Sequence, residues 1–201
     1  MLTLGINTAS SFSEIALLEG DQVLANERWE SQNDEAEKIM PKIAELLGDK
    51  TFQDISEVKV IKGPGSFTGL RIGVAVANAI SHLTGAKLSA LDTFAYWWTA
   101  HPSPEPSTAL LIFAGRGGVY VSLKPSELGQ LVNLPDLIPH LQSHNITSIF
   151  GDLSAAQKSH LSDFSFQPHT PDFPQALSTT HATHTLVKPL YIKPPNITMT
   201  T

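Results

Sequence analysis

The chain has 201 residues, 41% hydrophobic and 16% charged, and its 13 Lys and Arg against 19 Asp and Glu give a formal net charge of −6. This length suits one domain or two small ones, and the acidic balance argues against nucleic-acid binding driven mainly by electrostatic attraction. The lack of cysteine excludes disulfides, cysteine-ligated metals and cysteine nucleophiles, and without a basic leader or a membrane-length apolar run we expect a cytoplasmic protein.

The first thirty residues predict three antiparallel strands. Apolar segments cover residues 2–6, 14–18 and 22–26. The second and third segments are separated by Glu19-Gly-Asp21, whose residue types suit a tight turn. We therefore expect a β-meander at the start of the chain.

In the next segment, the spacing of the apolar residues changes to that of an amphipathic helix. Its apolar stripe consists of Ile39, Ile43, Leu46 and Leu47. Asp34 and Glu37 fit a capping box at the start of this helix, and Gly48 can end it.

A strand over residues 58–61 leads into a glycine-rich loop that consists of Gly63, Pro64, Gly65, Ser66, Phe67 and Thr68. A strand, a glycine-rich loop and a helix can bind phosphate through backbone N–H groups. A P-loop would need Lys followed by Ser or Thr where Leu70-Arg71 stands. The alternative is that the glycines only let the chain turn sharply into the next helix.

That next helix is predicted over residues 70–83 and is apolar almost all round. Small residues recur at every fourth position in Gly69, Gly73, Ala77 and Ser81. Such a stripe allows another helix to approach closely. Either the Ile39/Ile43 helix or a helix of a partner chain could be its neighbour.

After a strand at residues 87–91, Asp92 can cap a helix that runs through residue 98. Three prolines at alternate positions in residues 101–106 then favour an extended linker. We therefore expect an N-terminal lobe over residues 1–100, with partner-binding helices, and a C-terminal lobe and tail over residues 101–201.

The second half predicts smaller elements. Residues 109–113 and 119–123 resemble a hairpin, and Pro174 can begin a short helix over residues 175–177. The remaining expected elements are helices at 137–144 and 155–161 and strands at 146–150 and 190–192.

His140 and His144 have the i, i+4 spacing of a metal-binding pair, but no carboxylate lies close to them in the sequence. No paired carboxylates or Ser-His-Asp order stands out. We therefore predict no metal site and no catalytic residues.

Several segments resemble the TsaB (YeaZ) family. They are the opening strand with Thr8-Ala9, Ile39-Met-Pro41, Gly63-Pro-Gly-Ser-Phe-Thr-Gly-Leu-Arg-Ile-Gly73, Arg116-Gly-x-Val-Tyr120 and Pro189-Leu-Tyr-Ile-Lys193. The resemblance implies an α/β fold of the actin/Hsp70/sugar-kinase (ribonuclease H-like) type, with two related lobes of which the second is shortened. It also implies a non-catalytic subunit that supports a TsaD-like protein in threonylcarbamoyl transfer to adenosine of tRNA.

By this resemblance the expected partners are a TsaD-like subunit, a TsaE-like ATPase and, through the same helices, a second copy of the chain. Contact with tRNA would be indirect, and no membrane is involved. The residues expected at the partner interface are Glu35, Ile39, Ile43, Gly69, Arg71, Gly73, Ala77 and Ser81. On this interpretation a Gly73→Leu change abolishes partner binding and leaves the chain folded.

The chain departs from the family pattern where a nucleotide would bind. Asn7 replaces a carboxylate at the end of the first strand, and Glu35 stands where a histidine is usual. Asn7 and Thr8 are the candidate nucleotide-binding residues, but the loss of the carboxylate favours a chain with no cofactor of its own and with ATP or ADP only in a complex. The alternative function is an autonomous nucleotide-dependent phosphotransferase or hydrolase of the same fold.

Overall fold

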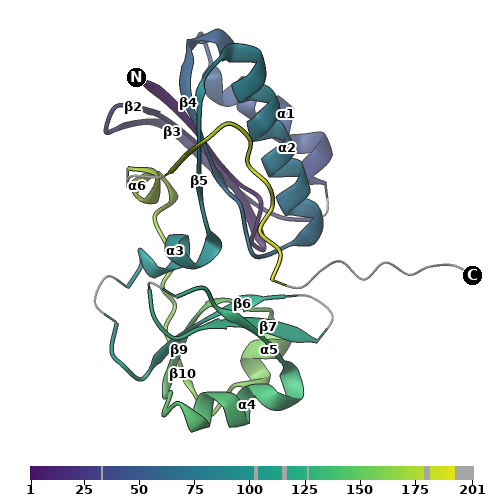
Figure 1. The fold of residues 1–201 in the computed structure, drawn as a ribbon, viewed down its shortest axis with the longest axis vertical. Coiled ribbons are helices and arrows are strands. Elements are labelled where there is room, and N and C mark those ends of the chain that lie inside the picture. The colour runs from purple at the N-terminus through teal and green to yellow at the C-terminus, as the bar shows by residue number, and fades with distance from the viewer. Residues whose placement is uncertain (33, 102–103, 115–116, 126, 179–181, 193–201) are drawn as a thin grey trace, which may run out of the picture.

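The computed structural model describes the chain except residues 33, 102–103, 115–116, 126, 179–181 and 193–201, so Arg116 and Lys193 of the expected motifs lie outside the described residues. Two β-sheets are stacked along the long axis of the molecule, with a short helix between them (Figure 1). None of the described helices is long and apolar enough to cross a membrane.

The first sheet has the strand order β11-β5-β4-β1-β2-β3. Its strands are β1 (Leu2–Asn7), β2 (Phe12–Glu19), β3 (Gln22–Glu30), β4 (Ile55–Ile61), β5 (Lys87–Leu91) and β11 (Ala182–His184). The predicted meander is confirmed, since β1, β2 and β3 pair antiparallel, whereas β4 pairs parallel to β1 and β5. Strand β5 leads into the short helix between the two sheets, so the carboxyl ends of the parallel strands point toward the second sheet (Figure 1).

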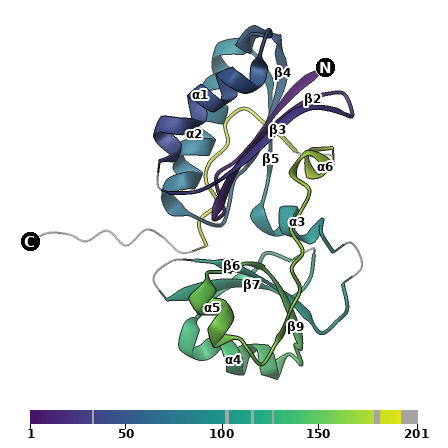
Figure 2. The same cartoon turned by 180° about the vertical axis from the view of Figure 1, so that it is seen from behind.

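Two long helices, α1 (Glu35–Leu47) and α2 (Phe67–Thr84), lie side by side on one face of this sheet (Figures 1 and 2). Ile39, Ile43 and Leu47 of the predicted stripe are buried there and Leu46 is partly buried, and the inward face of α2 is buried as well. The expected capping box is wrong, because Asp34 forms no capping hydrogen bond and instead pairs with Lys38 at 2.5 Å. A short 3-10 helix, η1 (Phe52–Asp54), precedes β4.

The second sheet has the order β10-β9-β6-β7-β8. Its strands are β6 (Thr108–Phe113), β7 (Gly118–Ser122), β8 (Gln130–Asn133), β9 (Ser148–Asp152) and β10 (Ser165–Phe166). The expected hairpin is confirmed in β6 and β7. Helices α4 (Leu134–Ser143) and α5 (Ala155–His160) cover the face turned away from the first sheet (Figure 2).

An apolar cluster fills the space between the two sheets. Helix α3 (Thr93–Trp98), which Asp92 caps as predicted, supplies Phe94, Tyr96, Trp97 and Trp98 to it. The face of the second sheet that meets α3 contributes residues such as Ile112 and Phe150. The lobes are thus joined by a continuous core.

After strand β10 of the second sheet, the chain returns to the first lobe. Helix α6 (Phe173–Leu177) packs on the first sheet through Leu177, and β11 pairs with the edge strand β5. Residues 190–192 form no strand, although the N–H of Leu190 donates to the carbonyl of Lys62 at 2.6 Å. The C-terminal segment therefore completes the lobe that the sequence assigned to residues 1–100, because the exposed edge of β5 and the uncovered sheet face accept it.

Candidate functional site

The glycine-rich loop packs directly on the end of β1. A Cβ atom at Gly65 would lie well under 3.0 Å from the carbonyl oxygen of Ala9, and one at Gly69 would do so at the carbonyl of Thr8. The N–H of Ser66 donates to the carbonyl of Ala9 at 2.8 Å, and Thr8 donates its hydroxyl to the carbonyl of Gly69 at 2.7 Å. These glycines are required for a close approach of two backbone segments.

The first turn of α2 is capped by the side chain of the residue that precedes it. The hydroxyl of Ser66 accepts a hydrogen bond from the N–H of Gly69, and the side chain of Leu70 is fully buried. Of the loop residues, Phe67 and Thr68 are exposed whereas Gly63 and Pro64 are buried. The sequence left two roles open for these glycines, phosphate binding and a sharp turn into the next helix. The geometry favours the second, structural role.

The small-residue stripe of α2 faces inward. A Cβ atom at Gly73 would collide with the hydroxyl of Thr8, and Ala77 is fully buried. Ser81, which is half-buried, donates its hydroxyl to the carbonyl of Ala86 at 2.7 Å. At Gly69 and Gly73 the predicted close approach is thus made to the end of the chain's own strand β1, so these two residues do not face a partner helix.

The same correction applies to the residues predicted on α1. Glu35 is 2% exposed, Ile39 is 1% exposed and Ile43 is fully buried, so none of them can contact a partner while the lobe is folded. Of the eight residues expected at a partner interface, Arg71 is exposed. Its guanidinium lies 5.5 Å from the ring centre of Phe67, which in turn packs against Tyr191.

The exposed sides of the two helices carry a different pair of rows. In α1 the exposed row consists of Ala36, Met40 and Ala44, and in α2 it consists of Ala75, Ala79 and Leu83. Each row repeats every fourth residue, so its members lie along one side of the helix. Leu83 is 77% exposed and Met40 is 41% exposed. Together these six residues form what we call the outer helix face.

Sequence reasoning missed the outer helix face although its spacing was readable. A helix with 3.6 residues per turn places rows of every fourth residue on all its sides, and both inner and outer rows here are small or apolar. In α1 the more hydrophobic row faces the protein's own core, whereas in α2 the row of small residues faces inward and the more hydrophobic Ala75, Ala79 and Leu83 are exposed. A second uncharged row on each helix was the signal for an external contact.

The candidate nucleotide-binding residues are engaged within the chain. Asn7 is fully buried, and its amide donates to a carboxylate oxygen of Glu14 at 2.8 Å while its own oxygen accepts from the N–H of Ala9. The hydroxyl of Thr8 is fully buried and bonded to Gly69, as described above. Neither side chain has a free polar group directed at a ligand.

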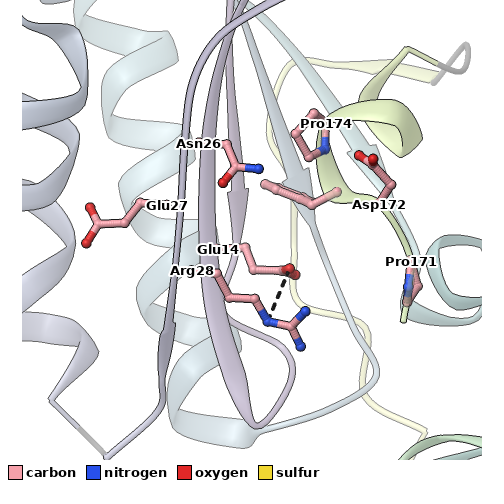
Figure 3. A pocket seen from close by; sticks show the side chains of 8 residues that line it. Glu14, Asn26, Glu27, Arg28, Pro171, Asp172 and Pro174 are labelled. Atoms are coloured by element: carbon pink, nitrogen blue, oxygen red, sulfur yellow. Dashed lines mark ion pairs between the residues drawn. The ribbon is translucent and has the colours of Figure 1, made fainter. Parts of the chain in front are cut away.

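Glu14 stands at the centre of this buried polar cluster. It accepts hydrogen bonds from Asn7 and from the hydroxyl of Tyr96 at 2.8 Å, and it lies 3.7 Å from the guanidinium of Arg28. Figure 3 shows Glu14 and Arg28 on the same side of the β2–β3 ribbon, beside a cavity of about 210 Å³, with Glu27 on the opposite side. Burial raises the pKa of Glu14 above its ordinary 4.5, against the lowering by Tyr96, Asn7 and Arg28.

The raised pKa of Glu14 predicts that the folding stability of the chain depends on pH. A carboxyl whose pKa is raised by folding stabilises the folded chain fully below its ordinary value of 4.5, and this contribution is lost as the pH rises through the folded pKa. Glu14→Gln keeps an oxygen acceptor for Asn7 and Tyr96 without the charge. We expect this variant to lose less stability than the wild type as the pH rises above 4.5, measured by thermal unfolding. Glu19→Gln, at the exposed end of β2, is the control, and parallel pH curves for Glu14→Gln and the wild type would contradict the assignment.

The described residues contain no group of three or more His, Asp or Glu side chains arranged to hold a metal ion. His140 and His144 do lie together, with ring centres 4.5 Å apart. The side chain of Gln130 contacts His140 at 3.1 Å, and the Nδ1 atom of His144 lies 2.9 Å from the carbonyl of His140. The pair is therefore satisfied by local hydrogen bonding.

Comparison with known proteins gives a family for this fold and loop. The family model described as TsaD, tRNA N6-adenosine threonylcarbamoyltransferase, matches residues 24–185. The tRNA threonylcarbamoyladenosine biosynthesis protein TsaB of Bacillus subtilis is 32% identical over 133 residues, which cover 65% of this chain and 58% of that protein. The TsaB protein of Escherichia coli is 32% identical over 90 residues, which cover 44% of this chain and 38% of that protein. The matches thus span less than two thirds of the length of these relatives.

Two solved structures from Pseudomonas aeruginosa share the fold. One, described as an uncharacterized protein with similarity to peptidase YEAZ, has a TM-score of 0.69 at 16% identity and covers 96% of this chain and 99% of that one. The other, YeaZ, has a TM-score of 0.62 at 17% identity and covers 88% and 89%. They confirm the predicted two-lobed α/β fold. Because the matching TsaD model covers most of the chain, the chain belongs to the TsaD family, and its curated relatives named TsaB agree with the resemblance to TsaB (YeaZ) proteins.

Proposed function

We propose that this chain is a non-catalytic subunit that binds a TsaD-like protein and supports threonylcarbamoyl transfer to adenosine of tRNA. The observation that carries the proposal is the outer helix face, where two parallel rows of uncharged side chains lie exposed on neighbouring helices. Rows of small residues let a second pair of helices approach closely, so a four-helix contact is the natural occupant. The names of the relatives supply the pathway.

Two further observations support an accessory role over an autonomous nucleotide-dependent enzyme. Both ends of the Asn7 amide are bonded within the chain, and the hydroxyl of Thr8 is bonded to Gly69. The apolar cluster with Trp97 and Trp98 packs between the lobes. A chain of this kind would act by holding its partner in a competent conformation, and it would use no cofactor of its own. ATP or ADP, and a TsaE-like ATPase, would enter only with the complex.

The test is co-expression with a TsaD-like protein followed by size-exclusion chromatography. An Ala75→Arg and Ala79→Arg double variant places two charges on the outer helix face, and both positions are exposed, so the isolated chain stays folded. Burying unpaired charges in a contact is costly, and we expect association to weaken by at least about 100-fold. The matched control is Ala156→Arg, at an exposed position of α5 on the second lobe.

The same variants test self-association. If a second copy of the chain uses the outer helix face, the double variant should be monomeric by light scattering at concentrations at which the wild type and Ala156→Arg are dimeric. Undiminished co-elution of the folded double variant with the partner would reject the outer helix face as the binding surface.

A further inference from the structure

An arginine and two aromatic rings lie together at the end of the outer helix face where α2 begins. Phe67 and Arg71 continue the exposed α2 row of that face, because each of them lies four residues from the next member of the row. Tyr191 joins them from the C-terminal segment, where its ring packs against Phe67. We call Phe67, Arg71 and Tyr191 the Arg71 cluster.

Hydrogen bonds hold the C-terminal segment beside α2. The side-chain amide of Asn78 donates to the carbonyl of Val187, and its oxygen accepts from the N–H of the same residue, both at 2.9 Å. Closer to the start of α2, the N–H of Leu190 donates to the carbonyl of Lys62. Figure 1 shows this segment, in yellow, running alongside α2 toward the first turn of that helix. These bonds place Tyr191 at the border of the outer helix face.

The two aromatic rings of the cluster are exposed although they pack on each other. Their centres lie 5.3 Å apart and their planes are tilted by 36°. Phe67 is 42% exposed and Tyr191 is 36% exposed. Aromatic side chains and arginine are enriched in protein–protein contacts, and the residues that contribute most to affinity are commonly Tyr, Trp and Arg. The Arg71 cluster therefore has the composition of an energetically important part of such a contact.

The charge of Arg71 is not paired within the part of the chain that the structure describes. Arg71 takes part in none of the ion pairs found there, and α2 contains no Asp or Glu. Its guanidinium lies 5.5 Å from the ring centre of Phe67, and an aromatic face positions a cation without neutralising its charge. The planar fork of N–H groups on a guanidinium matches the two oxygens of a carboxylate.

We propose that Arg71 binds a carboxylate of the TsaD-like partner, in a contact that extends past the two helices to Tyr191. The inference rests on the proposed function and names the chemical group of the partner that this end of the outer helix face recognises. An arginine covered by a partner needs an opposite charge, because a lone buried charge is costly. The net charge of −6 and the uncharged row beside Arg71 favour a protein over an RNA as the occupant.

The experiment measures the affinity of the whole chain for a purified TsaD-like protein by isothermal titration calorimetry. Arg71→Gln removes the charge-assisted hydrogen bonds, so binding should weaken about tenfold. Arg71→Glu should weaken binding about 100-fold or more, because two carboxylates would then face each other. Arg71 is exposed, so both variants should stay folded, which circular dichroism checks.

Lys158→Gln is the matched control. Lys158 is an exposed cation on α5 of the second lobe, and its ammonium lies 4.4 Å from the ring centre of Phe166, an arrangement like that of Arg71 on Phe67. It lies far along the chain from the outer helix face, so Lys158→Gln should bind the partner as the wild type does.

Tyr191→Ala tests the extension of the contact to the C-terminal segment. It removes one ring of the aromatic pair and leaves the backbone hydrogen bond of Leu190 in place. We expect a loss of affinity of about threefold to tenfold. Unchanged affinity would overturn the extension to Tyr191.

The outcomes separate this inference from the proposed function. If the Ala75→Arg and Ala79→Arg double variant loses the partner while both Arg71 variants bind as the wild type does, the carboxylate contact is overturned and the proposed function stands. Equal losses in Arg71→Gln and Arg71→Glu would also overturn the contact, because packing and not charge would then explain them. Failure of the wild type to bind the partner would overturn both.

A last arm tests RNA as the occupant. Fluorescence anisotropy with a short labelled single-stranded RNA measures its binding to the chain alone, since aromatic rings and arginine can also stack on bases. We expect no saturable binding. RNA binding that Arg71→Glu abolishes, together with unchanged partner binding by that variant, would assign the Arg71 cluster to RNA and overturn the proposal.

Discussion

A Gly69→Ala variant should lose about 3 kcal/mol or more of folding stability, one of the largest effects expected for any single methyl group in this chain. The added Cβ would lie well inside 3.0 Å of the carbonyl oxygen of Thr8. That oxygen belongs to the backbone at the end of β1 and cannot move without breaking the contact between β1 and α2. Urea unfolding followed by circular dichroism measures the loss.

A graded comparison tests this explanation. At Gly73 the added Cβ would meet the side-chain hydroxyl of Thr8 and not a backbone atom, so Gly73→Ala should cost less, about 1–2 kcal/mol. Combining Gly73→Ala with Thr8→Ala should recover part of that cost. Ala79→Leu, on the exposed side of the same helix, should change stability by no more than about 0.5 kcal/mol. Equal stabilities for Gly69→Ala and Ala79→Leu would refute the close-approach argument.

These expectations revise the interpretation of Gly73 made from the sequence. A leucine at this position would enter the space between α2 and β1, so it would unfold the lobe before it could report on a partner. Partner binding must therefore be probed on the outer helix face, where a change of side chain leaves the fold intact.

Trp98→Ala should cost about 3–5 kcal/mol and weaken the junction between the lobes. Trp98 is 3% exposed, its indole N–H donates to the hydroxyl of Ser122 at 3.0 Å, and its ring packs edge-on against Phe150 at 4.9 Å. Both contacts connect α3 to the second sheet. We expect unfolding of the variant to occur at lower urea than that of the wild type and over a broader or split transition, measured by circular dichroism.

Trp98→Phe separates the contribution of the indole hydrogen bond to Ser122 from that of ring packing against Phe150. It retains an aromatic ring against Phe150 but leaves Ser122 without the indole donor, so its cost should be smaller, about 1–3 kcal/mol. Thr99→Ala, next in the chain, is a control for local helix effects, because its hydroxyl bonds only to the carbonyl of Tyr96. If Trp98→Ala kept the wild-type midpoint, the aromatic cluster would not be what joins the lobes.

The sequence predicted most of the elements because their signals are local. The apolar segments and the turn residues between them predicted the meander, the i, i+4 stripe predicted α1, and Asp92 capped α3 as expected. Sequence patterns did not predict β11, whose three residues pair with β5 across a separation of more than ninety positions. A strand this short has little pattern of its own, and it forms because a sheet edge is available.

The choice between the faces of α1 and α2 was not decided by the sequence. Periodicity identifies rows of residues, but a helix cannot show by itself which row meets its own sheet. Glu35 illustrates the difficulty, since a charged residue at the start of a helix is expected to be exposed and here it is 2% exposed. Tertiary packing placed Gly69 and Gly73 of the small-residue row against the end of β1.

The sequence by itself determined the fold class, the glycine-rich loop and the resemblance to one family, because these depend on short patterns of residue type. Only the tertiary structure decided that the glycines serve a contact between β1 and α2, that Asn7 is bonded to Glu14, and that the outer helix face is free. The physical reason is that close approach, burial and hydrogen bonding are properties of pairs of segments. A side chain's neighbours exist only once the chain has folded.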